Sequence, residues 1–105
     1  MNHCRDAFGA ILVFDLTREK TFISCLNWLE DFRATVGEEP MVLMIGNKLD
    51  IVELDENNRK VNKQMAEQMA KRNGMLYIET SAVTNKNVEE AFEKLLMGEV
   101  LVLIL

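Results

Sequence analysis

Two short polar segments of the chain each follow an apolar run, and their residue types could bind a ligand together. In MVLMIGNKLD, residues 41–50, the apolar run ends and Asn47, Lys48 and Asp50 follow within four positions. Strands commonly end in turns rich in Gly, Asn and Asp, so this segment can also be an ordinary turn. The segment ETSAV, residues 79–83, offers a second polar group after its own apolar run, MLYI.

The residue types in these segments fit the edge of a guanine base. The carboxylate of Asp50 can accept hydrogen bonds from both N1–H and the 2-amino group, a charge-assisted pair. Adenine lacks that amino group, and a site built around a hydrogen-bonded group can reject such an analogue by as much as about 10⁴-fold. Asn47 can serve O6 and N7 or brace nearby loops, and the stem of Lys48 can lie over the base. A backbone N–H of the Ser81–Ala82 turn can reach O6.

The elements that must position these residues alternate between strand and helix. Helical segments are indicated where apolar residues recur every three or four positions, as Phe22, Cys25, Leu26 and Leu29 do. Short apolar runs rich in strand-forming residues lie between them. We expect strands at 10–16, 41–46 and 75–79, and helices at 19–34, 60–73 and 87–96.

The expected strands are apolar throughout, which is typical of a parallel sheet whose two faces are covered by helices. With right-handed crossovers, the sequence predicts an open α/β sheet of three parallel strands alternating with three helices. Ligands bind beyond the carboxyl ends of the strands in such sheets. The residues at those ends are Asp15, Asn47 to Asp50, and Thr80 to Ala82.

Composition narrows the class of protein. The 105 residues are 49% hydrophobic and 28% charged with a net charge of −5, as in a soluble globular domain, and the acidic balance argues against nucleic-acid binding. Cys4 and Cys25 suggest reduced thiols of a cytoplasmic protein, and their spacing, with the lone His3, predicts no metal site. Neither a secretory signal nor a transmembrane run is expected.

The paired motifs resemble a known family. N-K-x-D after one strand and E-T-S-A after the next are similar to the guanine-recognition motifs of the Ras superfamily of small GTPases. The segments RDAFGAILVFDLTREKTF, NWLEDF, MIGNKLD, YIETSA and NVEEAFEKL resemble the Rab branch, in the same order and at similar distances. The likeness reaches about Met97. We therefore expect residues 1–97 to form the C-terminal part of a GTPase domain, with 98–105 as an apolar tail of unclear role.

The resemblance implies roles for individual residues. It implies that Asn47, Lys48 and Asp50 contact the guanine base and that Ser81 and Ala82 close its other side. The family usually has Lys where this chain has Val83. Val83 can cover a face of the base but carries no charge, so we expect weaker retention of GTP or GDP without a change in base choice.

The phosphate-binding half of the family's motifs is absent from these residues. A P-loop needs G-x-x-x-x-G-K-[ST], and the glycines at 9, 37, 46, 74 and 98 include no pair at that spacing. The string Asp6–Gly9 matches D-x-x-G but precedes the first expected strand, where the metal-binding motif would follow one. We therefore expect a partial P-loop GTPase fold with no catalytic or metal-binding residue, which binds nucleotide weakly and does not hydrolyse GTP alone. Mg²⁺ would bind only in a full-length parent.

Three functions remain open at this stage. The resemblance implies a nucleotide-controlled switch in vesicle traffic, whose full-length parent meets effectors, exchange factors and activating proteins. The alternatives are a nucleotide-independent interaction module, using the Phe22–Phe32 helix and Trp28, or a non-functional truncated fragment with an open edge on its first strand. Rabs are anchored through prenylated C-terminal cysteines, and no cysteine lies near this C-terminus. The tail would continue the last helix or come from a frameshifted or spliced end.

Overall fold

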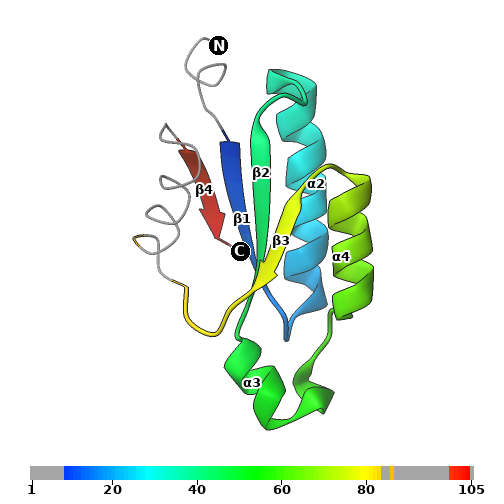
Figure 1. Cartoon of the computed structure of the whole chain (residues 1–105), viewed down its shortest axis with the longest axis vertical. Coiled ribbons are helices and arrows are strands. Elements are labelled where there is room, and N and C mark those ends of the chain that lie inside the picture. The colour runs from blue at the N-terminus through cyan, green and yellow to red at the C-terminus, as the bar shows by residue number, and fades with distance from the viewer. Residues whose placement is uncertain (1–8, 84–85, 87–99, 105) are drawn as a thin grey trace.

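The fold is an open parallel sheet with helices packed on it. The computed structural model describes residues 9–83, Lys86 and residues 100–104. Four parallel strands lie in the order β3-β2-β1-β4 (Figure 1). Along the chain the elements are β1 (Gly9–Asp15), α2 (Glu19–Val36), β2 (Met41–Asn47), α3 (Leu49–Leu54), the 3₁₀-helix η1 (Glu56–Asn58), α4 (Lys63–Arg72), β3 (Leu76–Glu79) and β4 (Val100–Ile104).

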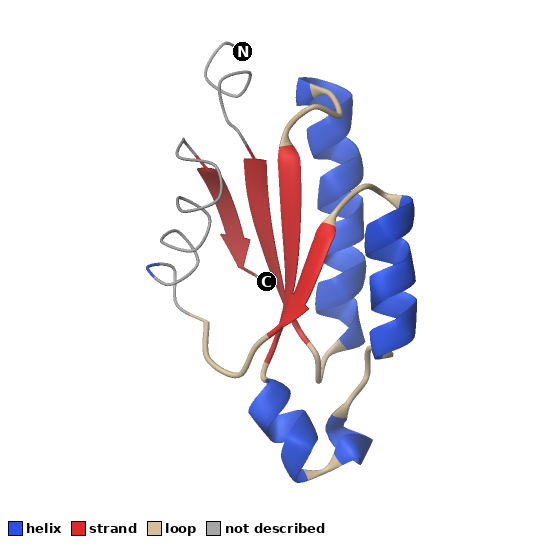
Figure 2. Ribbon diagram, viewed as in Figure 1, coloured by secondary structure: helices blue, strands red, loops and turns tan. Residues whose placement is uncertain are grey.

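The α/β class and the three predicted parallel strands are confirmed, and the first two predicted helices form as α2 and α4. Figure 2 shows these two helices on the same face of the sheet. The apolar stripe of α2 faces the core through Phe22, Cys25, Leu29 and Phe32. The predicted helix at 87–96 lies outside the described residues.

The local sequence explains where α4 begins and ends. The side chain of Asn62 caps its first turn by accepting a hydrogen bond from the backbone N–H of Met65 at 2.9 Å. Gly74 follows the helix with a φ of 66°, a conformation that glycine adopts without strain. The chain can therefore turn sharply into β3.

The core has two parts, one on each face of the sheet. The larger lies between the sheet and the helices, where Phe14 meets Phe22 edge to face with ring centroids 5.0 Å apart. The smaller consists of Ile11, Val13, Leu43 and Ile45, with Val83 packed against it. Every residue of β1 is buried, which explains why its sequence is apolar rather than alternating.

The glycine before Asn47 lies in a tightly packed position. A Cβ on Gly46 would lie 2.8 Å from both Leu16 Cδ2 and the Tyr77 hydroxyl, and 3.1 Å from Phe14 Cζ. The end of β2 therefore sits tightly against the core, so that Asn47 and the residues after it start from a fixed point.

Strand β4 corrects two expectations. The prediction of an open edge on the first strand is wrong, because β1 pairs with β2 on one side and with β4 on the other. A continuation of the last helix is also wrong for residues 100–104, which pair in parallel with residues 9–13. Three of these five residues, Val100, Val102 and Ile104, are β-branched, which favours a strand.

Trp28, which the alternative interaction module would use, takes part in the packing of α2. Trp28 is half-buried and stacks on Phe32 with ring centroids 4.8 Å apart, so its ring contributes to the packing of the helix.

The Cys25 thiol is free and buried, and burial raises its pKa to about 12. The thiol is therefore protonated and unreactive at neutral pH.

Candidate functional site

The two predicted motifs meet at the carboxyl edge of the sheet. Strands β2 and β3 pair in parallel, and two backbone hydrogen bonds continue this pairing beyond the strand ends. The Thr80 N–H donates to the Gly46 carbonyl at 2.8 Å, and the Leu49 N–H donates to the Thr80 carbonyl at 2.9 Å. Residues 47–50 and 80–82 therefore form one surface, which includes the first turn of α3 beyond the carboxyl ends of β2 and β3 (Figure 1).

Asn47 and Thr80 each hold a buried polar atom at this edge. Among the residues that the structure describes, neither the Asn47 Oδ1 nor the Thr80 Oγ1 has a hydrogen-bond partner. An unpaired buried polar atom costs about 1–3 kcal/mol, so such atoms indicate a position where further hydrogen bonds can form. Both residues belong to the predicted motifs.

Lys48 is held in an unusual backbone conformation. Its φ is 73°, the only positive φ of a non-glycine residue in the described part of the chain, and it precedes α3. Its ammonium Nζ lies 2.8 Å from Asp15 Oδ2. The half-exposed stem of Lys48 is thus tethered at its charged end.

Asp15 is the acceptor of that contact, and it is almost fully buried at the end of β1, paired in register with Asn47. Its other oxygen accepts hydrogen bonds from the Thr17 N–H at 2.8 Å and the Thr17 hydroxyl at 2.6 Å. Burial acts to raise the pKa of Asp15, but the hydrogen bonds from Lys48 and Thr17 outweigh it and hold the pKa below 3.8. The carboxylate is therefore ionised at neutral pH.

The remaining predicted residues line the same edge with different exposure. Asp50 lies in the first turn of α3, and its side chain is exposed, as are Ser81 and Ala82 after β3. Val83 is half-buried against the small apolar cluster on the sheet. Its predicted role as a cover for the base stays a prediction.

Glu79, the first residue of the second motif, forms a buried ion pair with Arg59, a partner that has no sequence signature. Arg59, just after η1, donates from Nη1 and Nη2 to the two carboxylate oxygens of Glu79, each at 2.9 Å. The Tyr77 hydroxyl adds a hydrogen bond to Glu79 at 2.7 Å, and Arg59 Nη1 also reaches the Val61 carbonyl. Burial acts to raise the pKa of Glu79, but the Arg59 and Tyr77 hydrogen bonds hold it below 4.5. This network fixes the end of β3 at Glu79, the first residue of E-T-S-A.

Acid is expected to destabilise the fold through Asp15 and Glu79. A carboxyl group whose pKa is lower in the folded state contributes stability above its unfolded pKa, and this stability is lost as the pH falls through the folded pKa. Both pKa values lie below the ordinary 3.8 and 4.5. We expect the melting temperature, followed by circular dichroism, to fall below about pH 4.5 and to fall less steeply in Asp15→Asn and Glu79→Gln. Equal slopes in all three proteins would contradict this assignment.

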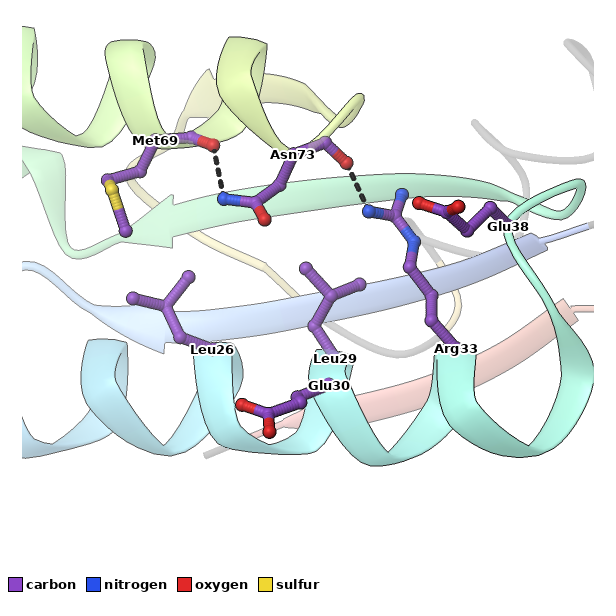
Figure 3. Close-up of a pocket in the computed structure, with 7 residues that line it drawn as sticks. All are labelled: Leu26, Leu29, Glu30, Arg33, Glu38, Met69 and Asn73. Atoms are coloured by element: carbon purple, nitrogen blue, oxygen red, sulfur yellow. Dashed lines mark hydrogen bonds between the residues drawn. The ribbon is translucent and has the colours of Figure 1, made fainter.

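The described residues line two hollows, and the second borders both motif segments through Leu49 and Glu79. One, of about 380 Å³, lies between α2 and α4 near the C-terminal ends of both helices, where Arg33 donates to the Asn73 carbonyl (Figure 3). The other, of about 530 Å³, lies beside the Arg59–Glu79 pair and has charges of both signs on its walls. None of the residues predicted to contact the base lines either hollow.

The described residues contain no cluster of three His, Cys, Asp or Glu side chains that could hold a metal ion. Within the same part of the chain, no helix has both the length and the apolar character needed to cross a membrane.

Comparison with known proteins assigns the family. The Ras family matches residues 1–100 of this chain. The Ras-related protein Rab-27B of Rattus norvegicus is 41% identical to it over 93 residues, which cover 88% of this chain and 41% of the relative. The chain thus spans about two fifths of the length of that curated relative. With its parallel α/β sheet and both motifs at the sheet's carboxyl edge, the chain belongs to the Ras family and is a Rab-like member of it.

Proposed function

We propose that this chain recognises the guanine base of GTP or GDP and that it does so as part of a Rab-like switch in vesicle traffic. The observation that carries the proposal is the pair of backbone hydrogen bonds between the two motif loops, through Thr80. These bonds hold the N-K-x-D and E-T-S-A residues on one surface before any ligand binds. A site organised in advance loses less entropy when its ligand is bound.

The residues of this edge match guanine by their chemistry. Asp50 is exposed and ionic, so it can accept hydrogen bonds from N1–H and the 2-amino group together. Asn47 brings a buried amide oxygen without a described partner, and its amide nitrogen can donate to N7. The Ser81–Ala82 turn is exposed and small enough for its backbone to approach O6. Together these groups supply donors where guanine accepts and acceptors where it donates.

Affinity for the whole nucleotide depends on its phosphates, and these 105 residues contain no G-x-x-x-x-G-K-[ST] segment. We therefore propose that the polypeptide contributes base recognition and that hydrolysis, and contacts with effectors, exchange factors and activating proteins, are properties of a full-length Rab. The switch in such a protein is read from loops that order around the γ-phosphate.

The proposal is tested with the purified 105-residue polypeptide. We expect a fluorescent GDP analogue to bind weakly and to be displaced by GDP and GTP. ADP and ATP at the same concentrations should not displace it. We expect no release of phosphate from GTP above the buffer rate with Mg²⁺ present. Equal displacement by adenine and guanine nucleotides would rule out the proposed base recognition, and turnover above the buffer rate would rule out the proposed division of roles.

A further inference from the structure

We propose that Asp15 is a positioning residue for the guanine site, which acts by holding the ammonium group of Lys48 so that the stem of this lysine stays at the base-binding edge. This inference rests on the proposed function. Asp15 lies outside both motifs, more than thirty positions before Lys48, and the fold brings the two together where β1 and β2 end side by side.

Hydrogen bonds to neighbouring residues hold the Asp15 carboxylate in place for its contact with Lys48. The carboxylate is buried, and one oxygen is already held by the backbone and the hydroxyl of Thr17. Its backbone is fixed too, because the Asp15 N–H donates to the Thr21 hydroxyl at 2.8 Å. The free oxygen, Oδ2, therefore points from a rigid base toward the lysine, and Lys48 Nζ lies 2.8 Å away. A buried carboxylate needs a cation or further donors, so this position selects a basic residue.

Lys48 is the more exposed partner of this contact. Its side chain is 46% exposed, and a lysine with that freedom would ordinarily sample many rotamers in water. Its backbone lies in the left-handed region, which β-carbon sterics disfavour, and it leads directly into α3 and Asp50. The contact with Asp15 restricts the rotamers of the Lys48 side chain and helps to hold its disfavoured backbone conformation. Losing it would free the lysine stem and loosen the start of the helix that carries Asp50.

A merely structural role for Asp15 predicts a different result from a positioning role. If Asp15 only stabilised the end of β1, its loss would weaken nucleotide binding regardless of which residue stands at position 48. If it acts through Lys48, its loss has no effect once the lysine ammonium has been removed. A double-mutant cycle separates the two because it measures this dependence directly.

The test compares GDP binding to the 105-residue chain and to Asp15→Asn, Lys48→Met and the double variant, by competition with fluorescent GDP. Asn keeps an acceptor for Thr17, and Met keeps the unbranched stem. We expect each single variant to bind GDP about three- to fivefold more weakly, as for a half-exposed ion pair. The double variant should bind no more weakly than Lys48→Met. Asp31→Asn, the same change at an exposed position of α2, should bind as the parent does.

NMR of the Lys48 ammonium in the parent chain tests the same contact without a substitution, and it still applies if Asp15→Asn does not fold. We expect the ¹⁵N signal of the Lys48 ammonium to be protected from exchange at neutral pH and to shift when acid protonates Asp15. Multiplicative losses in the double variant, an unchanged affinity in Asp15→Asn, or a lysine signal indifferent to acid would each overturn the inference. If the parent chain binds GDP no better than ADP, the proposed function fails and the inference fails with it. If the chain prefers GDP to ADP but the double-mutant cycle shows no coupling between Asp15 and Lys48, the inference fails and the proposed function stands.

Discussion

Asp50→Asn is expected to weaken GDP binding by about a hundredfold. The substitution replaces a carboxylate oxygen, which accepts from the 2-amino group of guanine, by an NH₂ group that faces this donor with another donor. The asparagine amide oxygen can still accept from N1–H of guanine, but its NH₂ group meets the 2-amino group. Xanthine has a carbonyl at position 2 instead, and this carbonyl accepts from the amide. The same variant should therefore bind xanthosine diphosphate more tightly than the parent chain does.

The reversal of base preference is measured by competition of GDP and xanthosine diphosphate for one fluorescent nucleotide. Glu53→Gln provides the matched control, since Glu53 is also an exposed acidic residue of α3 but lies outside the N-K-x-D motif. We expect this control to bind both nucleotides as the parent does. A uniform loss for both bases in Asp50→Asn would mean that Asp50 supports the loop without reading the base.

Glu79→Ala is expected to lower the free energy of unfolding by about 3 kcal/mol or more. The Glu79 side chain is 6% exposed and that of Arg59 13%, so removal of Glu79 leaves the largely buried guanidinium with only the exposed Glu56 as an acidic partner. It also deprives the Tyr77 hydroxyl of its acceptor. Urea unfolding followed by circular dichroism measures the change.

Two further variants separate the ion pair from other effects. Arg59→Met with Glu79→Leu removes both buried charges together, and we expect this double variant to be more stable than Glu79→Ala, since no buried charge is left without its buried partner. Glu56→Gln removes only the exposed partner of Arg59 and should change stability little. If Glu79→Ala unfolds at the same urea concentration as Glu56→Gln, the buried pair does not hold the E-T-S-A turn in place.

The fold was predictable where one physical signal dominated. Apolar runs bounded by turns marked β1, β2 and β3, and the helical spacing from Phe22 to Phe32 marked α2. Strand β4 escaped prediction because its pairing with β1 joins residues about ninety positions apart, and a short apolar run carries no information about its partner. The short helix α3 lies between two predicted elements, in a stretch for which no strand or helix was predicted, and it buries Val52.

The candidate site was predictable in its motifs and not in its supports. Asn47, Lys48 and Asp50 follow one strand and Ser81 and Ala82 another, so parallel strands alone suffice to bring them to one edge. The contacts that fix them come from Asp15 and Arg59, which lie in other segments. Asp15 could be suspected as a carboxylate ending an apolar run, but its pairing with Lys48 requires the register of β1 against β2.

The most direct test of the account is a titration of the ¹⁵N-labelled 105-residue chain with GDP, and with ADP in parallel, followed by two-dimensional NMR. The proposed site predicts that GDP shifts the backbone signals of residues 47–50 and 80–82 and leaves those at the far end of the sheet, near Pro40 and Met75, unchanged. ADP should produce much smaller shifts at the same concentration. Shifts of equal size with both nucleotides, or shifts that avoid the two loops, would contradict guanine recognition at this edge.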